Sequence, residues 1–404
     1  MGRDKTKLTD LPRLGLICIF SEFFFGLCLG AWAIAMNFHL SACGVGESQI
    51  GVLLCVGYLV TAVTSFFVGR VGDRRGFPFV MALGAVMMGF SLLLIANVRQ
   101  LPLFYIGHGV YCAGLACMVS MEFNLPLSLV KESQRQYSYN LVLVFYFLGS
   151  IVGNFLCSVC LPLFPQENPY RYILMICAVL YFLMALIRGR MPRQKPEVRE
   201  EAAAEGGVSV WAMLGRKKVR RYLLYGFLTF GLLTLSTGML NLVLRLWFNM
   251  SDSLVGLVFS INSVAGCLIL MVLPALVRRV ALHRISGVTM AVQFLALFTM
   301  AFAPGGLFVI MLFMRTISCN ILYTSVDSPM LQSMPAQIRG TYAGMRVFSN
   351  YVGESVASVV SGWIIDIRAF QGLFLLCAAV AFAQILTYQF LCAPFLKEKS
   401  VGQS

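Results

Sequence analysis

Charged side chains are scarce in this sequence. Asp, Glu, Lys and Arg make up 12% of its 404 residues and apolar residues 59%, whereas a soluble domain is about one quarter charged and half apolar. The chain has three histidines, none spaced from another for a shared metal ion. It also lacks a Gly-x-x-x-x-Gly-Lys-[Ser/Thr] loop for nucleotide phosphates. The composition excludes a soluble domain, and the missing motifs predict no metal, no cofactor, no coupling to ATP and no enzymatic activity.

Long apolar runs dominate the chain. A membrane-spanning helix needs about 20 mostly apolar residues, and we find twelve such runs separated by short polar stretches. We therefore predict an all-α membrane protein with twelve transmembrane helices. The runs cover residues 14–40, 48–69, 78–98, 102–127, 137–162, 171–189, 220–244, 253–276, 282–303, 306–330, 340–364 and 370–395.

The positive charges lie on one side of this predicted bundle. With both termini on the same side, that side collects 26 of the 31 lysines and arginines, including ten in residues 188–221. Basic residues in short loops stay in the cytoplasm, so we predict a multi-pass protein of the cell inner (plasma) membrane with both termini cytoplasmic. The net charge of +14 is then explained by topology, and no nucleic-acid partner is predicted.

The second half of the chain repeats the first after a shift of 204 residues. Gly149 falls on Gly353, whereas Glu122 falls one residue before Asp327. Together with equal numbers of apolar runs, this predicts two pseudo-symmetric six-helix bundles, an architecture of many secondary transporters. We predict an N-terminal bundle over 1–189, a cytoplasmic linker over 190–219 and a C-terminal bundle over 220–404.

One charged stretch carries a recognisable motif. Gly69-Arg70-Val71-Gly72-Asp73-Arg74-Arg75-Gly76 stands between the second and third apolar runs and is expected to form a tight loop at the membrane surface, since charges are costly in hydrocarbon. Gly69, Asp73, Arg74 and Gly76 match the Gly-x-x-x-Asp-[Arg/Lys]-x-Gly pattern between helices 2 and 3 of the major facilitator superfamily. Phe77 and Pro78 stand where the family pattern continues with basic residues. Taken with the helix count, the repeat and the linker, the whole chain resembles that family.

The resemblance implies a transporter that alternates between inward and outward openings around a central site. In that family, charged clusters at the cytoplasmic helix ends hold the outward-open state. Residues expected in such a gate lie at the corresponding helix ends of both halves: Gly69, Asp73, Arg74, Gly76, Glu122, Arg278, Asp327 and Arg346. Direct binding of protons or substrate is the alternative for Glu122 and Asp327, and Arg346 fits the gate or the central site equally.

Three ionisable residues are predicted near the middle of the membrane. Glu22 lies about 13 Å into the first helix and Glu354 about 22 Å into the eleventh, at 1.5 Å per residue, and Arg315 lies inside the tenth. Ionisable groups at this depth are functional candidates. The two acids are interpreted as groups that couple protons or contact substrate, or as halves of structural ion pairs. Arg315 is expected to bind an anion or to pair with one of these acids.

Polar neighbours of these ionisable residues extend the predicted site. Asn320, Tyr323, Asn350 and Tyr351 lie within about two turns of Arg315 or Glu354, with interhelical hydrogen bonding as their alternative role.

His39 and His108 are expected at the membrane interface. Cys43 is the one cysteine expected in an outer loop, and no disulfide is predicted.

These patterns predict a proton-coupled secondary active transporter of a small, charged organic solute, working by alternating access as a symporter or antiporter. A multidrug/proton efflux antiporter is the alternative, although the Gly149-x-x-x-Gly153 segment lacks the rest of the drug-antiporter motif. An amphiphile flippase and a membrane receptor without transport are further alternatives. The predicted partners are a small-molecule substrate, protons and membrane lipid, and a monomer is the default for this architecture.

Overall fold

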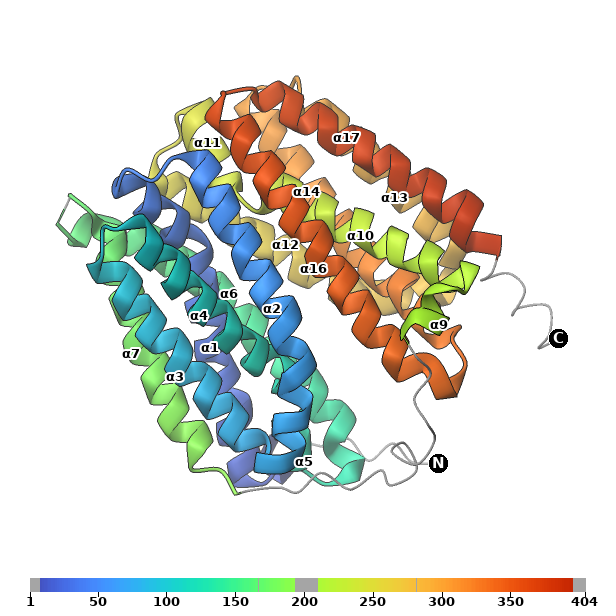
Figure 1. The fold of residues 1–404 in the computed structure, drawn as a ribbon, viewed down its shortest axis with the longest axis horizontal. Coiled ribbons are helices and arrows are strands. Elements are labelled where there is room, and N and C mark those ends of the chain that lie inside the picture. Colours follow the sequence, from blue (N-terminus) through green and yellow to red (C-terminus); the bar gives the residue numbers. More distant parts are fainter. Residues whose placement is uncertain (1–7, 166, 193–209, 281, 395–404) are drawn as a thin grey trace. The chain divides into compact units, whose positions relative to one another are not determined.

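The computed structural model describes residues 8–165, 167–192, 210–280 and 282–394 (Figure 1). Every regular element in these ranges is a helix, as apolar runs of this length predict. Most of the predicted linker lies outside the described residues, so its conformation stays a prediction.

Ten segments of the described residues are long and apolar enough to cross a membrane. The predicted runs at 282–303 and 340–364 form helices that are not among the ten. The first contains a shorter apolar helix, Arg284–Met300. The second carries Arg339, Arg346 and Glu354 among many serines, which lowers its mean hydropathy. These two helices account for the difference between the ten apolar helices and the twelve predicted spans.

The chain forms two compact units. Unit 1 contains the described residues of Met1–Val45, Val63–Val198 and Ser251–Ser263, and so includes the second part of α2 and the first part of α12. Its elements are η1 (Leu8–Asp10), α1 (Arg13–Ala42), α2 (Glu47–Arg75), α3 (Phe77–Asn97), α4 (Leu101–Met121), α5 (Asn124–Ser128), η2 (Glu132–Gln134), α6 (Arg135–Cys160), η3 (Leu161–Leu163), α7 (Pro169–Gly189) and α12 (Asp252–Arg279).

Unit 2 contains the described residues of Gly46–Ala62, Arg199–Met250 and Val264–Ser404. It includes the first part of α2 and the second part of α12. Its other elements are α9 (Val210–Leu214), α10 (Lys217–Thr237), α11 (Leu240–Phe248), α13 (Leu282–Met300), α14 (Gly305–Leu322), the π-helical η4 (Tyr323–Asp327), α15 (Ser328–Gln332), α16 (Ala336–Asp366), α17 (Phe370–Leu386) and the π-helical η5 (Thr387–Cys392).

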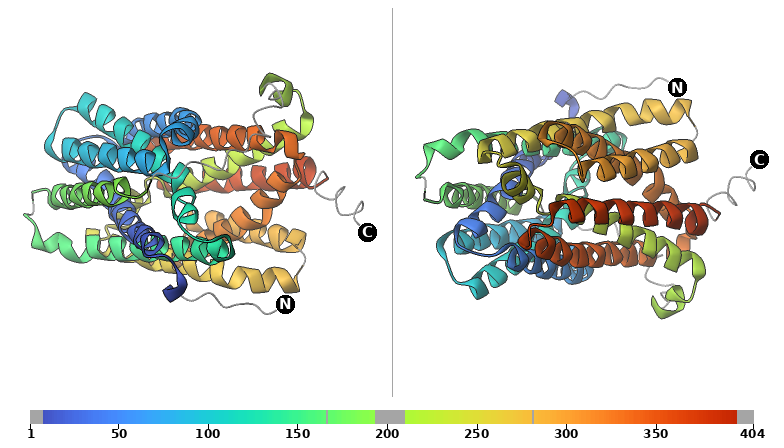
Figure 2. Two further views of the ribbon diagram at one scale, coloured as in Figure 1. Left: turned by 90° about the horizontal axis from the view of Figure 1, so that it is seen from below. Right: turned by 90° about the horizontal axis from the view of Figure 1, so that it is seen from above.

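Helix pairing follows the same scheme in each unit (Figure 2). In unit 1, α1 packs along α6, and α3 lies between α4 and α7; in unit 2, α10 packs along α16, and α13 contacts α14 and α17. Gly149 of α6 lies so close to α1 that an added Cβ would overlap the Phe23 carbonyl oxygen, and Gly353 of α16 meets the Phe227 carbonyl of α10 in the same way. Both partners of the second contact lie 204 residues after those of the first. Glycine lets membrane helices approach this closely.

The stretch expected to be a surface loop is mostly helical. α2 continues through Arg75, and the chain turns at Gly76, whose φ is 92°. The backbone N–H of Gly76 still donates to the Gly72 carbonyl at 2.8 Å. The expectation of an eight-residue loop was wrong, because a helix continues beyond hydrocarbon while its own hydrogen bonds hold. A single glycine makes the reversal because it tolerates positive φ.

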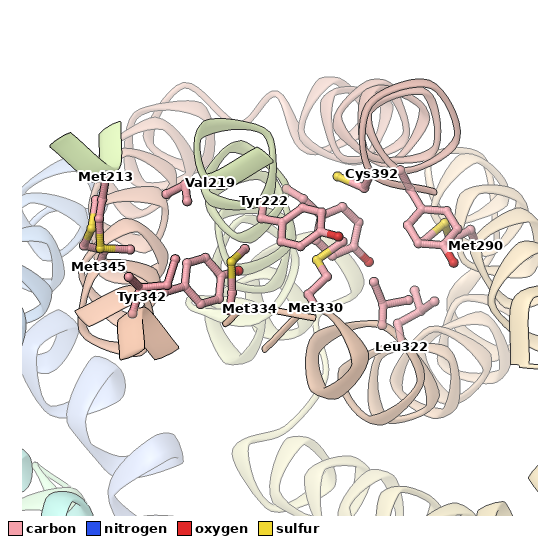
Figure 3. Close-up of a cluster of buried hydrophobic side chains, with 14 residues drawn as sticks. Met213, Val219, Tyr222, Met290, Leu322, Met330, Met334, Tyr342, Met345 and Cys392 are labelled. Atoms are coloured by element: carbon pink, nitrogen blue, oxygen red, sulfur yellow. The ribbon is translucent and has the colours of Figure 1, made fainter. Parts of the chain in front are cut away.

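Unit 2 has a core rich in methionine and tyrosine at one end (Figure 3). Tyr222 and Tyr225 of α10 and Tyr342 of α16 are at most 1% exposed. The cluster also contains Met330 and Met334 from the segment before α16. Methionine fills irregular gaps between rigid rings, so this core fixes the ends of α10, α14 and α16, and its Tyr342 lies near Asp327 and Arg346.

Candidate functional site

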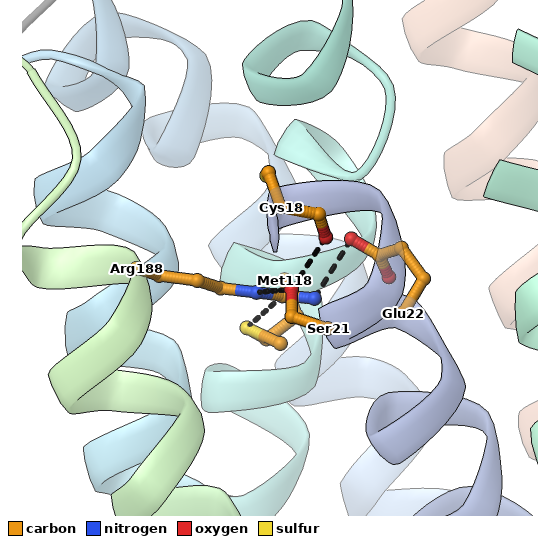
Figure 4. A network of polar contacts seen from close by, with 5 residues as sticks. All are labelled: Cys18, Ser21, Glu22, Met118 and Arg188. Carbon is orange, nitrogen blue, oxygen red and sulfur yellow. Dashed lines mark hydrogen bonds and ion pairs between the residues drawn. The ribbon is translucent and has the colours of Figure 1, made fainter. Parts of the chain in front are cut away.

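A buried ion pair joins α1 and α7 in unit 1 (Figure 4). Glu22 Oε1 lies 2.7 Å from Arg188 Nη2, and both side chains are 0% exposed. Arg188 comes one residue before the end of α7, and its long side chain reaches into the unit. The structure therefore gives Glu22 a cationic partner within its own unit.

Three further groups hold the guanidinium of Arg188. Its Nε donates to Ser21 Oγ at 3.1 Å, and its Nη1 lies 3.3 Å from Met118 Sδ. Its Cζ lies 5.8 Å from the centre of the Phe25 ring, a favourable arrangement for a cation over an aromatic face. Glu22 Oε2 is buried and has no hydrogen-bond partner among the described residues. One carboxylate oxygen of Glu22 thus contacts Arg188, while the other can still accept a hydrogen bond.

Sequence reasoning missed Arg188. It was counted with the basic residues of the 188–221 segment on the cytoplasmic side, but the structure places its side chain fully inside unit 1. The burial was not anticipated because an arginine near a helix end can extend several carbons away from its backbone position; its place on the cytoplasmic side stays a prediction. The available signal was Glu22, since a carboxylate at that depth requires a cation or a proton.

Glu122 belongs to the same region of unit 1. It follows the last residue of α4, is 9% exposed and interacts electrostatically with Glu22 and Arg188. Tyr146 of α6 lies near both acids. Arg74, which was expected in the same gate as Glu122, is exposed. Two acids therefore share the surroundings of one buried arginine.

Arg315 in unit 2 is buried without an acidic partner among the described residues. It lies on α14, is 2% exposed, and its Nη2 donates to Ser236 Oγ at 2.6 Å and to the Leu233 carbonyl at 3.2 Å, both on α10. Its Nε has no hydrogen-bond partner there. The guanidinium therefore retains donor capacity and an unneutralised charge.

Unit 2 also contains a buried acid, Glu354, without a basic partner among the described residues. It lies on α16, is 8% exposed, and its Oε2 has no hydrogen-bond partner among the described residues. Asn350, one turn earlier, packs against Gly226 of α10, and its Oδ1 is also without a partner. A buried carboxyl group without a cation is expected to carry a proton, so α16 presents a proton-binding group and an unsatisfied amide on one face.

The structure describes the side chains of some of the remaining gate residues but not of others. Asp327, in the π turn η4, lies 3.7 Å from Arg346 Nη1 of α16, and both side chains are largely buried. The side chains of Asp73 and Arg278 lie outside the described part of the structure, so their gate roles stay predictions. Gly69 lies inside α2, and a Cβ added there would meet no neighbouring atom. The structure therefore gives no steric reason for a glycine at this position.

The predicted polar neighbours do not gather around Arg315. Asn320 donates to the Thr316 carbonyl and lies against Gly266 of α12. Tyr323 is 56% exposed and meets the edge of Phe230. Tyr351 stacks on Tyr58 of α2, with ring centres 6.5 Å apart. These residues point to different helices, because neighbouring positions on a helix surface diverge by about 100°.

An aromatic group in unit 1 was also missed. Trp32 of α1 stacks on Tyr111 and His108 of α4, with ring centres 5.0 and 6.1 Å away. His108 and His39 are at most 2% exposed, and His39 lies in the last turn of α1; their interfacial position stays a prediction. Trp32 and Tyr111 stand 204 residues before Ser236 and Arg315. The same pair of helix positions therefore carries stacked rings in unit 1 and a charged hydrogen bond in unit 2.

Apolar helices long enough to span a bilayer, paired alike in two units and enclosing ionisable groups, define a multi-pass membrane protein with features typical of transporters. The family model of the Major Facilitator Superfamily matches residues 15–358, and the chain belongs to this family. No curated protein sequence matches the chain.

Solved structures share the fold. A variant of the nucleoside transporter NupG superposes with a TM-score of 0.80 at 14% identity, over 94% of this chain and 100% of that one. The D-xylose-proton symporter gives 0.73 at 12% identity, over 93% and 97% of the two chains. The E. coli fucose:proton symporter gives 0.60 at 17% identity, over 92% and 97%.

Proposed function

We propose that this protein is a proton-coupled secondary active transporter of a small, charged organic solute, working by alternating access. We further propose that twelve helices in two bundles cross the inner membrane and that both termini lie in the cytoplasm. The similar folds of xylose and fucose proton symporters support proton coupling, and the one-sided distribution of basic residues supports the topology.

The observation that carries the charged-solute proposal is the environment of Arg315. A guanidinium cannot lose its proton in a protein, and a buried charge is costly unless it is paired. Arg188 meets this need with Glu22, whereas Arg315 has only a hydroxyl and a carbonyl oxygen among the described residues. A carboxylate or phosphate on the solute would supply the missing negative charge and accept the free N–H groups.

Glu354 is our proposed proton-coupling residue. Its carboxyl group is buried without a cation among the described residues, so it can exchange a proton when access to water changes. Glu22 was proposed for the same role, but its contact with Arg188 favours a structural ion pair, which keeps an acid ionised. Asp327 and Arg346 are proposed to form the gate in unit 2.

Ligand-induced thermal stabilisation of the purified protein tests the charged-solute proposal. The panel contains organic anions, amino acids, nucleosides, sugars and bulky cationic drugs, each at two pH values. A ligand that binds the folded state raises its melting temperature. We expect stabilisation by anionic compounds that is lost in Arg315→Ala and retained in the exposed-site control Arg284→Gln. Stabilisation by bulky cations that depends on Glu354 would instead support the multidrug antiporter.

Transport into proteoliposomes tests the coupling proposal, using a compound found in that panel. Glu354→Gln should abolish accumulation driven by a pH gradient while leaving exchange of labelled for unlabelled solute intact. Gln keeps the size of the side chain but cannot release a proton. Unchanged accumulation in this variant would remove Glu354 from the coupling mechanism without affecting the assignment of Arg315.

A further inference from the structure

A polar cavity of about 230 Å³ lies at one end of unit 1. It is formed where α1 and α3 end and where α4 and α7 begin, and we call it the end cavity. None of the residues proposed above for transport or gating lines it. Its polar and ionisable lining side chains include His39, Cys43, Asn97, Arg99, Glu167 and Arg171.

The charges that line the end cavity are mostly positive. Arg99 and Arg171 oppose the single acid Glu167, and all three are exposed. Arg171 uses Nη2 to hold Asn97 Oδ1, which leaves its other N–H groups free among the described contacts. Neither arginine lies within 4.0 Å of a carboxylate in the described part of the chain. Two guanidinium groups thus border one small space, and the single acid in its lining, Glu167, forms no ion pair with either of them in the described part of the chain.

Buried contacts hold the wall of the end cavity in place. His39, 1% exposed, lies with Nε2 3.0 Å from the Ile95 carbonyl and Nδ1 3.3 Å from Asn168 Oδ1. Asn168 in turn lies with Nδ2 3.7 Å from Cys43 Sγ. One histidine therefore ties together the ends of α1 and α3 and the segment before α7. A pre-formed wall lowers the entropy lost when a ligand binds.

Size and lining define the class of ligand. The cavity is smaller than the about 300–1,000 Å³ typical for drug-sized molecules, and its charged lining does not suit an apolar group. Guanidinium groups match planar carboxylates and phosphates in a two-point geometry. We propose that the end cavity binds a small anion through a carboxylate or phosphate group held by Arg99 and Arg171.

Cys43 provides a reporter inside this cavity. Its thiol is partly exposed; burial raises the pKa of Cys43, while the neighbouring Arg99 guanidinium opposes that shift. The thiolate is the reactive form, so modification at mildly alkaline pH should proceed at a measurable rate. That rate reports both access to the cavity and its electrostatic potential.

The first experiment compares two methanethiosulfonate reagents on the purified protein, one carrying a sulfonate and one a trimethylammonium group. Modification of Cys43 is followed by peptide mass spectrometry, and Cys43→Ala identifies its signal. One charge about 7 Å away changes the local concentration of a charged reagent about threefold in water. Arg99→Gln should therefore lower the ratio of anionic to cationic rates by up to about ninefold, while Arg135→Gln, at the other end of the unit, should leave it unchanged.

The second experiment measures protection of Cys43 by inorganic phosphate and by acetate, against potassium chloride at equal ionic strength. We expect saturable protection that is lost in Arg99→Gln and in Arg171→Gln and occurs at lower phosphate concentration in Glu167→Gln. Nanodiscs containing phosphatidylglycerol or only phosphatidylcholine separate a lipid headgroup from a soluble anion as the source. Protection that is equal for chloride, or unchanged in both arginine variants, would overturn the proposal. No transport is measured, so failure here leaves the proposed function untouched.

Discussion

The two units handle a buried arginine in opposite ways. In unit 1, Arg188 is neutralised by Glu22 at 2.7 Å and is fully enclosed. In unit 2, Arg315 is equally buried but is held by a hydroxyl and a carbonyl oxygen, and Glu354 is an acid without a cation among the described residues. A neutralised pair stabilises a unit, whereas separated opposite charges remain available to external partners. Under the proposed function, unit 1 serves mainly as scaffold and unit 2 carries the reactive groups.

The difference arises on one common framework. Gly149 meets Phe23 in unit 1 as Gly353 meets Phe227 in unit 2, so the two helix pairs make this contact at equivalent positions, 204 residues apart. At the next equivalent positions, Trp32 and Tyr111 stack in unit 1, while Ser236 and Arg315 bond in unit 2. Backbone packing is thus conserved between the units while the side chains at matching positions differ in chemistry.

The largest expected effect comes from breaking the pair in unit 1. Glu22→Gln leaves Arg188 charged and buried, and removal of one partner of such a pair costs about 3–5 kcal/mol of stability. Arg188→Met should cost less, because Glu22 can then take up a proton, and its cost should decrease as the pH is lowered. Unfolding in detergent, monitored by circular dichroism, gives both values.

Glu47→Gln is the matched control for that experiment. Glu47 pairs with Arg368 at 3.3 Å, but the arginine is 51% exposed, and exposed pairs contribute about 0–1 kcal/mol. A loss of stability in Glu22→Gln no larger than in Glu47→Gln would show that the buried pair does not stabilise unit 1.

A smaller effect is expected from the glycine contacts. Gly149→Ala and Gly353→Ala each push a methyl group into a backbone carbonyl of the facing helix, and overpacking costs about 1–3 kcal/mol. Gly287→Ala, a helical site with open space around it, should be neutral or slightly stabilising because alanine favours helix. Similar losses at 149 and 353 would support equivalent packing; tolerance at only one site would contradict it.

The smallest effect is expected from removing the arginine of unit 2. Arg315→Met deletes an uncompensated charge, and Ser236 Oγ retains its contact with the Leu232 carbonyl at 2.6 Å. The change in unfolding free energy should therefore stay within about 1 kcal/mol. A destabilisation as large as that of Glu22→Gln would show that Arg315 has a structural role and would weaken its assignment to solute binding.

The family and the helical class were accessible from sequence because they depend on local properties. Apolar runs, the Gly69 to Gly76 motif and the positions of basic residues each report on a few neighbouring residues. The motif nevertheless misled about local structure: its charges indicated a loop, but the helix continues to Arg75 and only Gly76 turns.

The partners of the buried charges were not accessible, because they depend on contacts between distant helices. The Glu22 to Arg188 pair spans 166 residues, and no local pattern indicates that Arg188 bends inward. Asn320 and Tyr323 are near Arg315 in sequence, yet they face other helices. The depth of an ionisable residue could be read from the sequence, but the direction of its side chain could not.

The π turn η4 lies where the two halves differ by one residue. Asp327 stands one residue beyond the position that corresponds to Glu122 after the shift of 204. A π turn holds one more residue than an α turn, so an insertion between Arg315 and Asp327 can be absorbed without rotating the following residues by about 100°. A one-residue gap in η4 aligns the two acids, and because Gly149 and Gly353 are again 204 residues apart, the register requires that one residue be lost between Asp327 and Gly353.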